Sequence, residues 1–240
     1  MKNPFLLLIL ALVVLNSCSG VFGRRVRGNG KISSENRSVE HFSGVEVSGA
    51  IDLYLSQDSV ESVRVEADEN LLQYVQVERN GSELSVHTKS GIRLKPSRTV
   101  KVYISGPSIS TISASGACDV FSENRLAGSD KISVDLSGAS DAKLDLKAPR
   151  VSVSLSGAGT VTLKGETRDF EVDGSGSTDI KCYELLTENT NVDISGAGSA
   201  EIFASVKLDV EVSGAADVRY KGNATVSQRV SGAGSVKKVD

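Results

Sequence analysis

Residues 192–200, Val-Asp-Ile-Ser-Gly-Ala-Gly-Ser-Ala, contain a tripeptide that recurs along the chain and decides the fold. The tripeptide is Ser-Gly-Ala, or Ser-Gly-Ser in one copy, and one isolated copy precedes the main series. Its glycines are Gly49, Gly116, Gly138, Gly157, Gly176, Gly196, Gly214 and Gly232. From Gly116 onward the steps are 22, 19, 19, 20, 18 and 18 residues. A nearly fixed period of this size indicates an architecture of stacked repeats.

The residues on both sides of each glycine alternate between apolar and polar. Apolar residues mostly occupy the positions two and four before the glycine and four and six after it, as Val192, Ile194, Ala200 and Ile202 do around Gly196. This period of two is typical of strands with one buried face, and a helix would need apolar spacings of three and four. Each copy is therefore predicted to be a strand, a glycine turn and a second strand.

A repeat of 18 to 22 residues has the right length for one coil of a β-solenoid. Its extended contour of about 60 to 70 Å accommodates two or three short strands and their turns. We predict an all-β fold, a β-solenoid resembling a parallel β-helix, with a less regular second turn near residues 124–131, 147–150, 165–169 and 188–191. A β-sandwich is the alternative, since its strands also recur about every 8 to 12 residues, but it gives no reason to repeat one tripeptide.

The N-terminal residues indicate export. Residues 1–17 combine Lys2 with a short apolar run, which is typical of a signal peptide. Leu15-Asn-Ser-Cys18 resembles the lipobox of bacterial lipoproteins, which implies cleavage before Cys18 and lipidation of that cysteine. An ordinary signal peptide is the alternative. We expect an exported protein that is lipid-anchored to the bacterial cell envelope, at the outer membrane, with its periplasmic or surface orientation left open.

The remaining chain is predicted to form a tether and one domain. Residues 18–37 are expected to be a lipidated, flexible tether because their Gly-rich and Arg-rich composition supports no core. The tether's basic residues could contact anionic headgroups, although a solvated linker is the preferred interpretation. Residues 38–238 are expected to be a single β-solenoid domain, with a less regular N-terminal β lobe at 38–107 and the repeats at 108–238.

Within the lobe, the patterns predict several local elements. Residues 45–55 form a strand, turn and strand, and residues 63–67 and 98–105 form further strands. Asp68 is expected to cap a short helical turn. Residues 74–86 are predicted to be a hairpin that turns at Asn80-Gly81. The lobe should cover one end of the stack, where bare strand edges would invite association.

The residue types and their spacing indicate neither an enzyme nor a cofactor. The net charge of −3 gives no basic footprint for nucleic acid. His41 and His87 are far apart and are expected to be surface or packing residues. Cys118 and Cys182 occupy different positions in non-adjacent repeats, so no disulfide is expected between them. The five tyrosines (Tyr54, Tyr103 and three others) are expected to serve in packing.

One polar row, three residues after each glycine, is a candidate metal site. Its members are Asp119, Asp141, Thr160, Asp179, Ser199, Asp217 and Ser235. Stacked coils would bring the acids at 119, 141, 179 and 217 into a ladder of oxygen ligands suited to calcium. The preferred interpretation has these side chains bonding the backbone of their own turns, with no metal bound.

The order of these features resembles a known family. Residues 42–53, Phe-Ser-Gly-Val-Glu-Val-Ser-Gly-Ala-Ile-Asp-Leu, are followed by Asp-Glu-Asn-Leu-Leu at 68–72, the hairpin and the Ser-Gly-Ala repeats. Together they resemble the bacterial family described as "putative auto-transporter adhesin, head GIN domain", over roughly residues 38–236. The resemblance implies a β-solenoid-like fold in an exported lipoprotein of unknown function.

Three functional classes fit these observations. The preferred one is a membrane-anchored, non-catalytic binding or adhesion-type module of the cell envelope that uses the repetitive surface of a solenoid. The alternatives are a structural or accessory envelope protein and a polysaccharide-active enzyme. The expected partners are the membrane, through the N-terminal lipid, and an envelope protein or glycan whose identity the sequence leaves open, as it does the oligomeric state.

Overall fold

The computed structural model describes residues 23–39 and 41–240, and strands make up most of this part of the chain. The single helical element there is one 3-10 turn, η1 (Leu72–Tyr74). The predicted all-β class is therefore confirmed. In the same residues, no helix has the length and apolar character needed to cross a bilayer. The predicted signal peptide and Cys18 lie outside the described residues.

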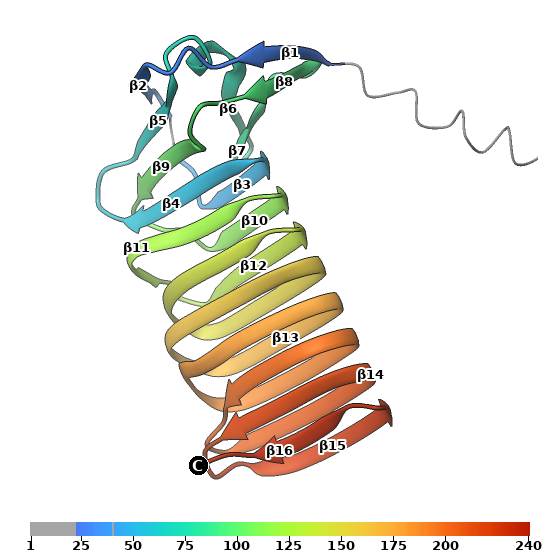
Figure 1. The fold of residues 1–240 in the computed structure, drawn as a ribbon. Helices are drawn as coiled ribbons and strands as arrows, with labels where there is room; N and C mark the ends of the chain where they lie inside the picture. The colour runs from blue at the N-terminus through green and yellow to red at the C-terminus, as the bar shows by residue number, and fades with distance from the viewer. Residues whose placement is uncertain (1–22, 40) are drawn as a thin grey trace, which may run out of the picture.

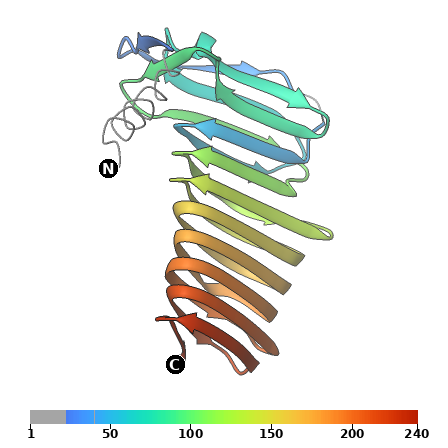
Figure 2. The ribbon, with the colours of Figure 1, turned by 90° about the vertical axis from the view of Figure 1, so that its right-hand side faces the viewer.

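The repeats stack as coils, with strands of successive coils paired in parallel (Figures 1 and 2). The strands of the stack are β3 (Gly44–Gly49), β4 (Ile51–Gln57), β10 (Thr111–Gly116), β11 (Asp119–Ala127), β12 (Lys131–Gly138), β13 (Asp141–Phe203), β14 (Lys207–Lys221), β15 (Thr225–Gly232) and β16 (Ser235–Lys238). β13 alone passes three of the turn glycines. Parallel pairing between repeats does not fit the alternative β-sandwich, whose sheets are antiparallel.

The turn glycines form a single column. Gly116 is in register with Gly49 on one side and Gly138 on the other, and the column continues to the last copy. Their φ angles lie between 82° and 133°, in the region that favours glycine. A Cβ built on Gly157 would lie 2.4 Å from the carbonyl oxygen of Gly138. Successive coils thus approach too closely at this turn to leave room for a side chain, which explains why every repeat has glycine at this position.

The alternating residues fill the interior of the coils. Val134, Val153 and Val192 are fully buried, and so are their counterparts after the turn, such as Ala200 and Ile202. The polar residues between them point outward, as the period of two requires. Each coil buries its apolar face against the coils above and below it, so the core runs the length of the stack.

The lobe covers one end of the stack, as predicted, but the stack begins inside the range 38–107 that we assigned to the lobe. β7 (Glu83–Thr88) pairs in parallel with β3, and β9 (Val100–Gly106) pairs in parallel with β4. β6 (Val75–Asn80) and β5 (Ser62–Asp68) then add antiparallel to β7 and β9. The stack therefore begins at Gly44, and the isolated copy at Gly49 is the turn of its first coil.

Residues 24–37 do not form the flexible tether that we predicted. β1 (Arg24–Arg27) pairs in parallel with β8 (Ile92–Lys95), and β2 (Ile32–Arg37) pairs antiparallel with β5. The prediction failed because backbone pairing to distant strands, which composition does not reveal, orders this segment.

Two local predictions in the lobe were also inaccurate. The side chain of Asp68 does not cap η1; it is fully buried and accepts hydrogen bonds from Gly30 N (2.7 Å), Ser97 N (2.8 Å) and Ser97 Oγ (2.7 Å). These bonds join the N-terminal segment to the lobe. The predicted hairpin is present, but Asn80 pairs with Glu83, so Gly81 and Ser82 form the turn. Gly81 supplies the positive φ of 66° that such a turn needs.

Candidate functional site

The polar row that we singled out as a metal candidate lies on the outward face of the strands that follow the glycine turns. Ser199 Oγ donates to Asp179 Oδ1 at 2.7 Å, and Ser235 Oγ donates to Asp217 Oδ1 at 2.6 Å. The backbone N–H of Thr160 donates to Asp141 Oδ1 at 2.6 Å. These acids therefore bond the next coil, whereas our preferred interpretation had them bonding their own turn.

At the start of the row the acids are adjacent to one another. Asp119 is in register with Asp141 and also with Asp52, a member of the row that sequence reasoning missed. Burial raises the pKa of Asp52, the Asp119 carboxylate raises it further, and Lys101 acts in the opposite direction. Within residues 23–39 and 41–240, no group of three or more His, Cys, Asp or Glu side chains is placed to hold a metal ion.

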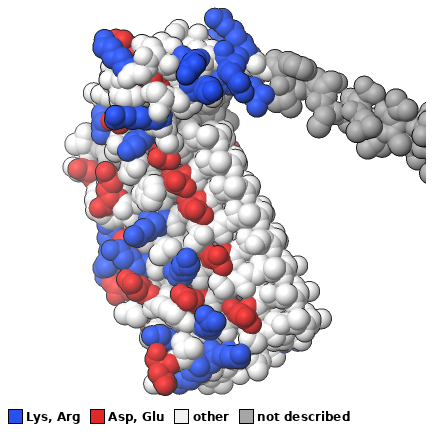
Figure 3. All heavy atoms as spheres, viewed as in Figure 1, with Lys and Arg blue, Asp and Glu red and all other residues white. Residues whose placement is uncertain are grey.

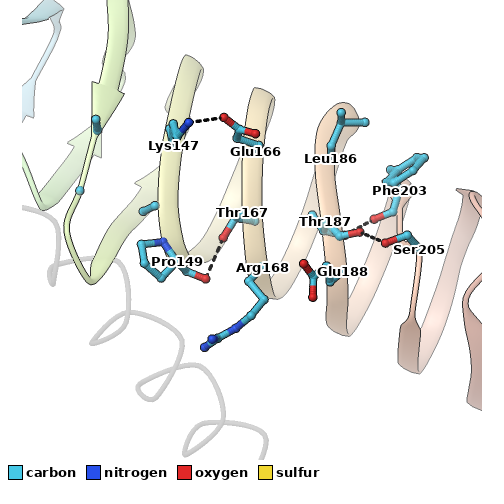
Figure 4. Close-up of a pocket in the computed structure, with 13 residues that line it drawn as sticks. Lys147, Pro149, Glu166, Thr167, Arg168, Leu186, Thr187, Glu188, Phe203 and Ser205 are labelled. Atoms are coloured by element: carbon cyan, nitrogen blue, oxygen red, sulfur yellow. Dashed lines mark hydrogen bonds and ion pairs between the residues drawn. The ribbon is translucent and has the colours of Figure 1, made fainter.

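An open groove lies at the irregular corner of the coils, where the second turns are (Figure 4). It has a volume of about 650 Å³ and is lined by Ala127, Gly128, Lys147, Ala148, Pro149, Glu166, Thr167, Arg168, Leu186, Thr187, Glu188, Phe203 and Ser205. We call it the corner groove. Consecutive coils contribute about three residues each, so the groove runs along the stack rather than around one coil.

Charged residues lie along the corner groove. Lys147 Nζ lies 2.7 Å from Glu166 Oε1, and Figure 4 shows the two side chains pointing toward each other from adjacent coils. The hydrogen bond from Lys147 and the positive charges of Lys147 and Arg125 lower the pKa of Glu166. Arg168 pairs with Asp169 at 2.8 Å. A carboxyl group with a lowered pKa stays ionised at neutral pH, which is the opposite of what a general acid needs.

Apolar and hydroxyl groups form the rest of the corner groove. Leu186 is 54% exposed and presents an apolar side chain to the open groove. Thr187 is buried, and its hydroxyl contacts the hydroxyl of Thr190 at 2.6 Å. Ser205 Oγ donates to the carbonyl oxygen of Thr187 at 2.9 Å. Hydrogen bonds between neighbouring coils therefore fix the backbone beneath Leu186, so the exposed leucine stands on a rigid base.

A second groove, of about 440 Å³, lies on the outward face of β11 and β13. Its lining contains equal numbers of positive and negative side chains, together with two aromatic rings. These residues are Lys143, Lys164, Lys181, Asp145, Glu184, Glu201, Phe121 and Tyr183. Phe121 ends a column of stacked rings: Tyr54 lies 5.2 Å from Phe121 and 4.9 Å from Tyr103, between ring centroids. Tyr54 is therefore stacked between two rings, and the Arg64 guanidinium lies 3.9 Å from the centroid of the Tyr103 ring, so both tyrosines pack against neighbouring side chains.

The remaining candidates lie apart from both grooves. His41 Nδ1 lies 3.6 Å from Glu61 in the lobe, and His87 is on β7. Cys118 and Cys182 are free and buried in the core. Burial raises the pKa of the Cys182 thiol to about 12, so it is not a nucleophile at neutral pH.

Sequence reasoning missed the lining of the corner groove. Its residues lie at the second turn, where the repeats differ in length and share no motif. The available signal was the position of those length differences, at residues 147–150, 165–169 and 188–191. Variable positions at one corner of a regular stack are where a specific surface can be built without disturbing the core.

Comparison with solved structures supports the fold. A crystal structure described as a putative adhesin from Bacteroides fragilis is 21% identical and has a TM-score of 0.85, covering 89% of this chain and 100% of its own. A putative adhesin from Parabacteroides distasonis is 25% identical with a TM-score of 0.73, covering 90% and 100%. A putative lipid binding protein from the same species is 19% identical with a TM-score of 0.73, also covering 90% and 100%.

The sequence comparisons give the family. Among curated proteins, the search finds no match. The family model described as "Putative auto-transporter adhesin, head GIN domain" matches residues 41–224, from three residues before β3 to three residues after β14. Since this match spans well over half of the chain, the protein belongs to that family.

Proposed function

We propose that the protein is a non-catalytic, adhesion-type binding module of the bacterial cell envelope, anchored to the membrane by a lipid on Cys18. In this proposal the stacked coils are a β-solenoid, a rigid elongated domain whose binding surface lies along one corner of the coils. The partner is a polymer of the envelope, either a glycan or an extended segment of a protein.

The corner groove is the observation that carries the proposal. It is open, about 650 Å³ in volume, and crosses several coils in the direction of the stack. A groove of this form accommodates a chain-like ligand better than a compact small molecule, which a concave and largely enclosed pocket holds best. Leu186 offers an exposed apolar anchor, and the ion pair of Lys147 with Glu166 offers polar contacts beside it.

The charges of the groove favour binding over catalysis. Hydrolysis of a glycan needs a pair of carboxyl groups, one of which is protonated at the working pH. In the corner groove, the hydrogen bond and charge of Lys147 lower the pKa of Glu166, which makes this carboxyl unsuited to be the protonated member of such a pair. We therefore prefer binding to the alternative of a polysaccharide-active enzyme. Membership in an adhesin-like family supports the same choice.

Substitution in the corner groove tests the proposal. Leu186→Arg places a long charged side chain across the groove at a position that is already 54% exposed, so the fold should tolerate it. Val60→Arg is the matched control, because Val60 is 65% exposed in the lobe and lies outside the groove. Binding of the full chain to immobilised envelope fractions and to a glycan array is measured for the parent and both variants.

We expect the Leu186→Arg variant to lose at least tenfold in affinity for one class of envelope polymer, while the Val60→Arg variant binds as the parent does. Equal binding by all three proteins would show that the groove is not the binding site. Binding by none of them would favour the structural or accessory role. Any bound glycan is also checked for new reducing ends, whose appearance would support the enzyme instead.

A further inference from the structure

The two-stranded ribbon of β1 and β8, at the lobe end of the molecule, carries a concentration of positive charge. Arg25 is in register with Arg93, and Arg27 is in register with Lys95. Residues two apart on a strand share a face, so these four cations lie on one face of the ribbon. All four are exposed. In Figure 3 the Lys and Arg side chains near the ribbon form a blue group at the upper right. We call these four residues the cationic quartet.

The arrangement of the cationic quartet is unfavourable in isolation. Like charges directly opposite each other across two strands destabilise the pair. Within residues 23–39 and 41–240, none of the four side chains forms an ion pair, although other Lys and Arg residues of the lobe do. Lys31 pairs with Glu69 at 3.0 Å, for example. The quartet is therefore a cationic surface that this part of the chain leaves without counter-charges, and an anionic partner would relieve its repulsion.

The ribbon is held so that the quartet faces outward. Val26 and Leu94, on its other face, are partly buried against the core. Gly28 N donates to the carbonyl oxygen of Lys95 at 3.0 Å, and Asn70 Nδ2 donates to the carbonyl oxygen of Arg27 at 2.8 Å. The buried carboxylate of Asp68 holds Gly30 just beyond the ribbon. A preorganised cationic face loses less entropy on binding than a flexible basic tail does.

We propose that the cationic quartet is a membrane-docking surface that binds the anionic phosphate headgroups of lipids. The inference rests on the proposed lipid anchor at Cys18. Four residues separate Cys18 from Gly23, so the chain contour between these two residues is at most about 18 Å, and Gly23 directly precedes the ribbon. Guanidinium groups match phosphate oxygens with two parallel hydrogen bonds, and three of the four cations are arginines.

Docking through the quartet would orient the whole molecule. The ribbon lies at one end of the stack and β15 and β16 lie at the other (Figure 1). The coils would then project from the membrane, and the corner groove, whose lining runs from Ala127 of β11 to Ser205 just after β13, would lie along the side of the projecting stack. A flexible tether alone would leave that orientation free.

A fluorescent label beside the ribbon tests the docking. Cys118 and Cys182 are buried, so a maleimide dye should react selectively with a new exposed cysteine. Ser90→Cys places the dye next to β8, and Ser227→Cys on β15 is the matched distal site; both serines are exposed. The full chain is reconstituted in vesicles of phosphatidylcholine, with or without phosphatidylglycerol, that contain a lipid with a quenching headgroup.

We expect quenching of the Ser90→Cys dye in anionic vesicles, its loss at high salt, and no quenching at Ser227→Cys. Replacing Arg93 and Lys95 by Gln should lower the ratio of docked to free molecules about fivefold for each cation removed. The double replacement of Lys237 and Lys238 by Gln removes the same charge from the far end and should change nothing. Quenching that is equal in neutral and anionic vesicles, or unaffected by the Arg93 and Lys95 replacements, would overturn the proposal.

Two further measurements separate the docking from the anchor and from the fold. If the maleimide labels the parent chain in the folded state, Cys18 is free and the proposed anchor fails. The same vesicle comparison is then made with a Cys18→Ser chain, where the effect of Arg93→Gln and Lys95→Gln still decides the role of the quartet. In solution, those two replacements should leave the melting temperature unchanged or raise it, because they remove a repulsion. A lower docked ratio then cannot result from unfolding.

Discussion

The carboxylate of Asp179 accepts a hydrogen bond of 2.7 Å from the hydroxyl of Ser199, which occupies the same position one coil further along the stack. Asp217 and Ser235 repeat the relationship at 2.6 Å. In this part of the row each acid is followed by a residue that donates a hydrogen bond. The alternation separates the negative charges and links the coils without any bound cation.

The alternation leads to a prediction about calcium. Because the neighbouring hydroxyl already satisfies Asp179, millimolar calcium should leave the melting temperature unchanged, whereas a ligand that binds only the folded protein would raise it. Asp179→Ala should cost about 1 kcal/mol of unfolding free energy through the lost hydrogen bond. Calorimetry with and without a chelator checks both statements. If calcium raised the melting temperature of the parent by several degrees but not that of Asp179→Ala, the row would be a calcium site after all.

The glycine column predicts a strong position dependence for alanine substitutions. A Cβ on Gly157 would clash with the backbone of Gly138 and sit on a residue with φ of 111°. Gly157→Ala should therefore lower the unfolding free energy by about 3 kcal/mol or more, from backbone strain and overpacking together. Gly81→Ala is the control, since Gly81 has a φ of 66° but no atom within 4 Å of the new methyl group.

In the control, strain acts alone and the expected loss is about 1 kcal/mol. Denaturation in urea gives both values. If the two variants lost equal stability, close approach of the coils could not be the reason for the repeated glycine.

Asp68 predicts a dependence of stability on pH. Burial works to raise its pKa, but hydrogen bonds from the backbone and hydroxyl of Ser97 and from the backbone of Gly30 lower the pKa overall. A group whose pKa is lower in the folded state stabilises the fold above its ordinary pKa of 3.8, and this contribution is lost as the pH falls through the lowered value.

Asp68→Asn replaces an acceptor oxygen by an amide group that is itself a hydrogen-bond donor, opposite the donors of Ser97 and Gly30. The free energy of unfolding should therefore fall by about 2 to 3 kcal/mol at pH 7. The difference in unfolding free energy between the variant and the parent should become smaller at pH values below the ordinary pKa of Asp68. Urea denaturation at pH 7 and at pH 3 checks this, with the exposed Asp58→Asn as the control. A constant difference between variant and parent at both pH values would mean that the carboxylate charge is not what holds the N-terminal segment.

Cys182 predicts a contrast between two conservative replacements. It is 1% exposed, in an interior row that Leu163 and Ile202 continue on the adjacent coils. The unfolding free energy of Cys182→Val should stay within about 1 kcal/mol of that of the parent. Cys182→Ser buries a hydroxyl in an apolar row, so its unfolding free energy should be lower by about 1 to 3 kcal/mol. Thermal unfolding of the two variants checks the order. A serine variant as stable as the valine variant would indicate that water reaches this row.

The stack was predictable from sequence because each coil must repeat the same backbone conformation at the same point. Gly157 shows why: the turn needs a positive φ and the neighbouring carbonyl excludes a side chain. The strands of the N-terminal segment were not predictable. Arg24–Arg27 has no apolar alternation, and its order comes from pairing with β8, more than sixty residues away in the sequence.

The candidate site was less accessible to sequence reasoning than the fold. Lys147, Glu166, Leu186 and Phe203 share no motif, and only the stacking of their coils brings them together. The cationic quartet could be half predicted, because Arg25 and Arg27 are visible as a basic cluster. That Arg93 and Lys95 join them depends on the register of β1 with β8, which local pattern does not contain.

The single glycine column also makes the chain modular. Gly157 and Gly176 occupy the same place on adjacent coils, so removing residues 158–176 would rejoin the chain at an equivalent point of the next turn. The molecule would become shorter by about 4.8 Å, one strand spacing, while every other coil kept a neighbour of the same shape. A chain with one coil removed or added would therefore keep the same architecture, and the distance between its two ends would change by one whole step.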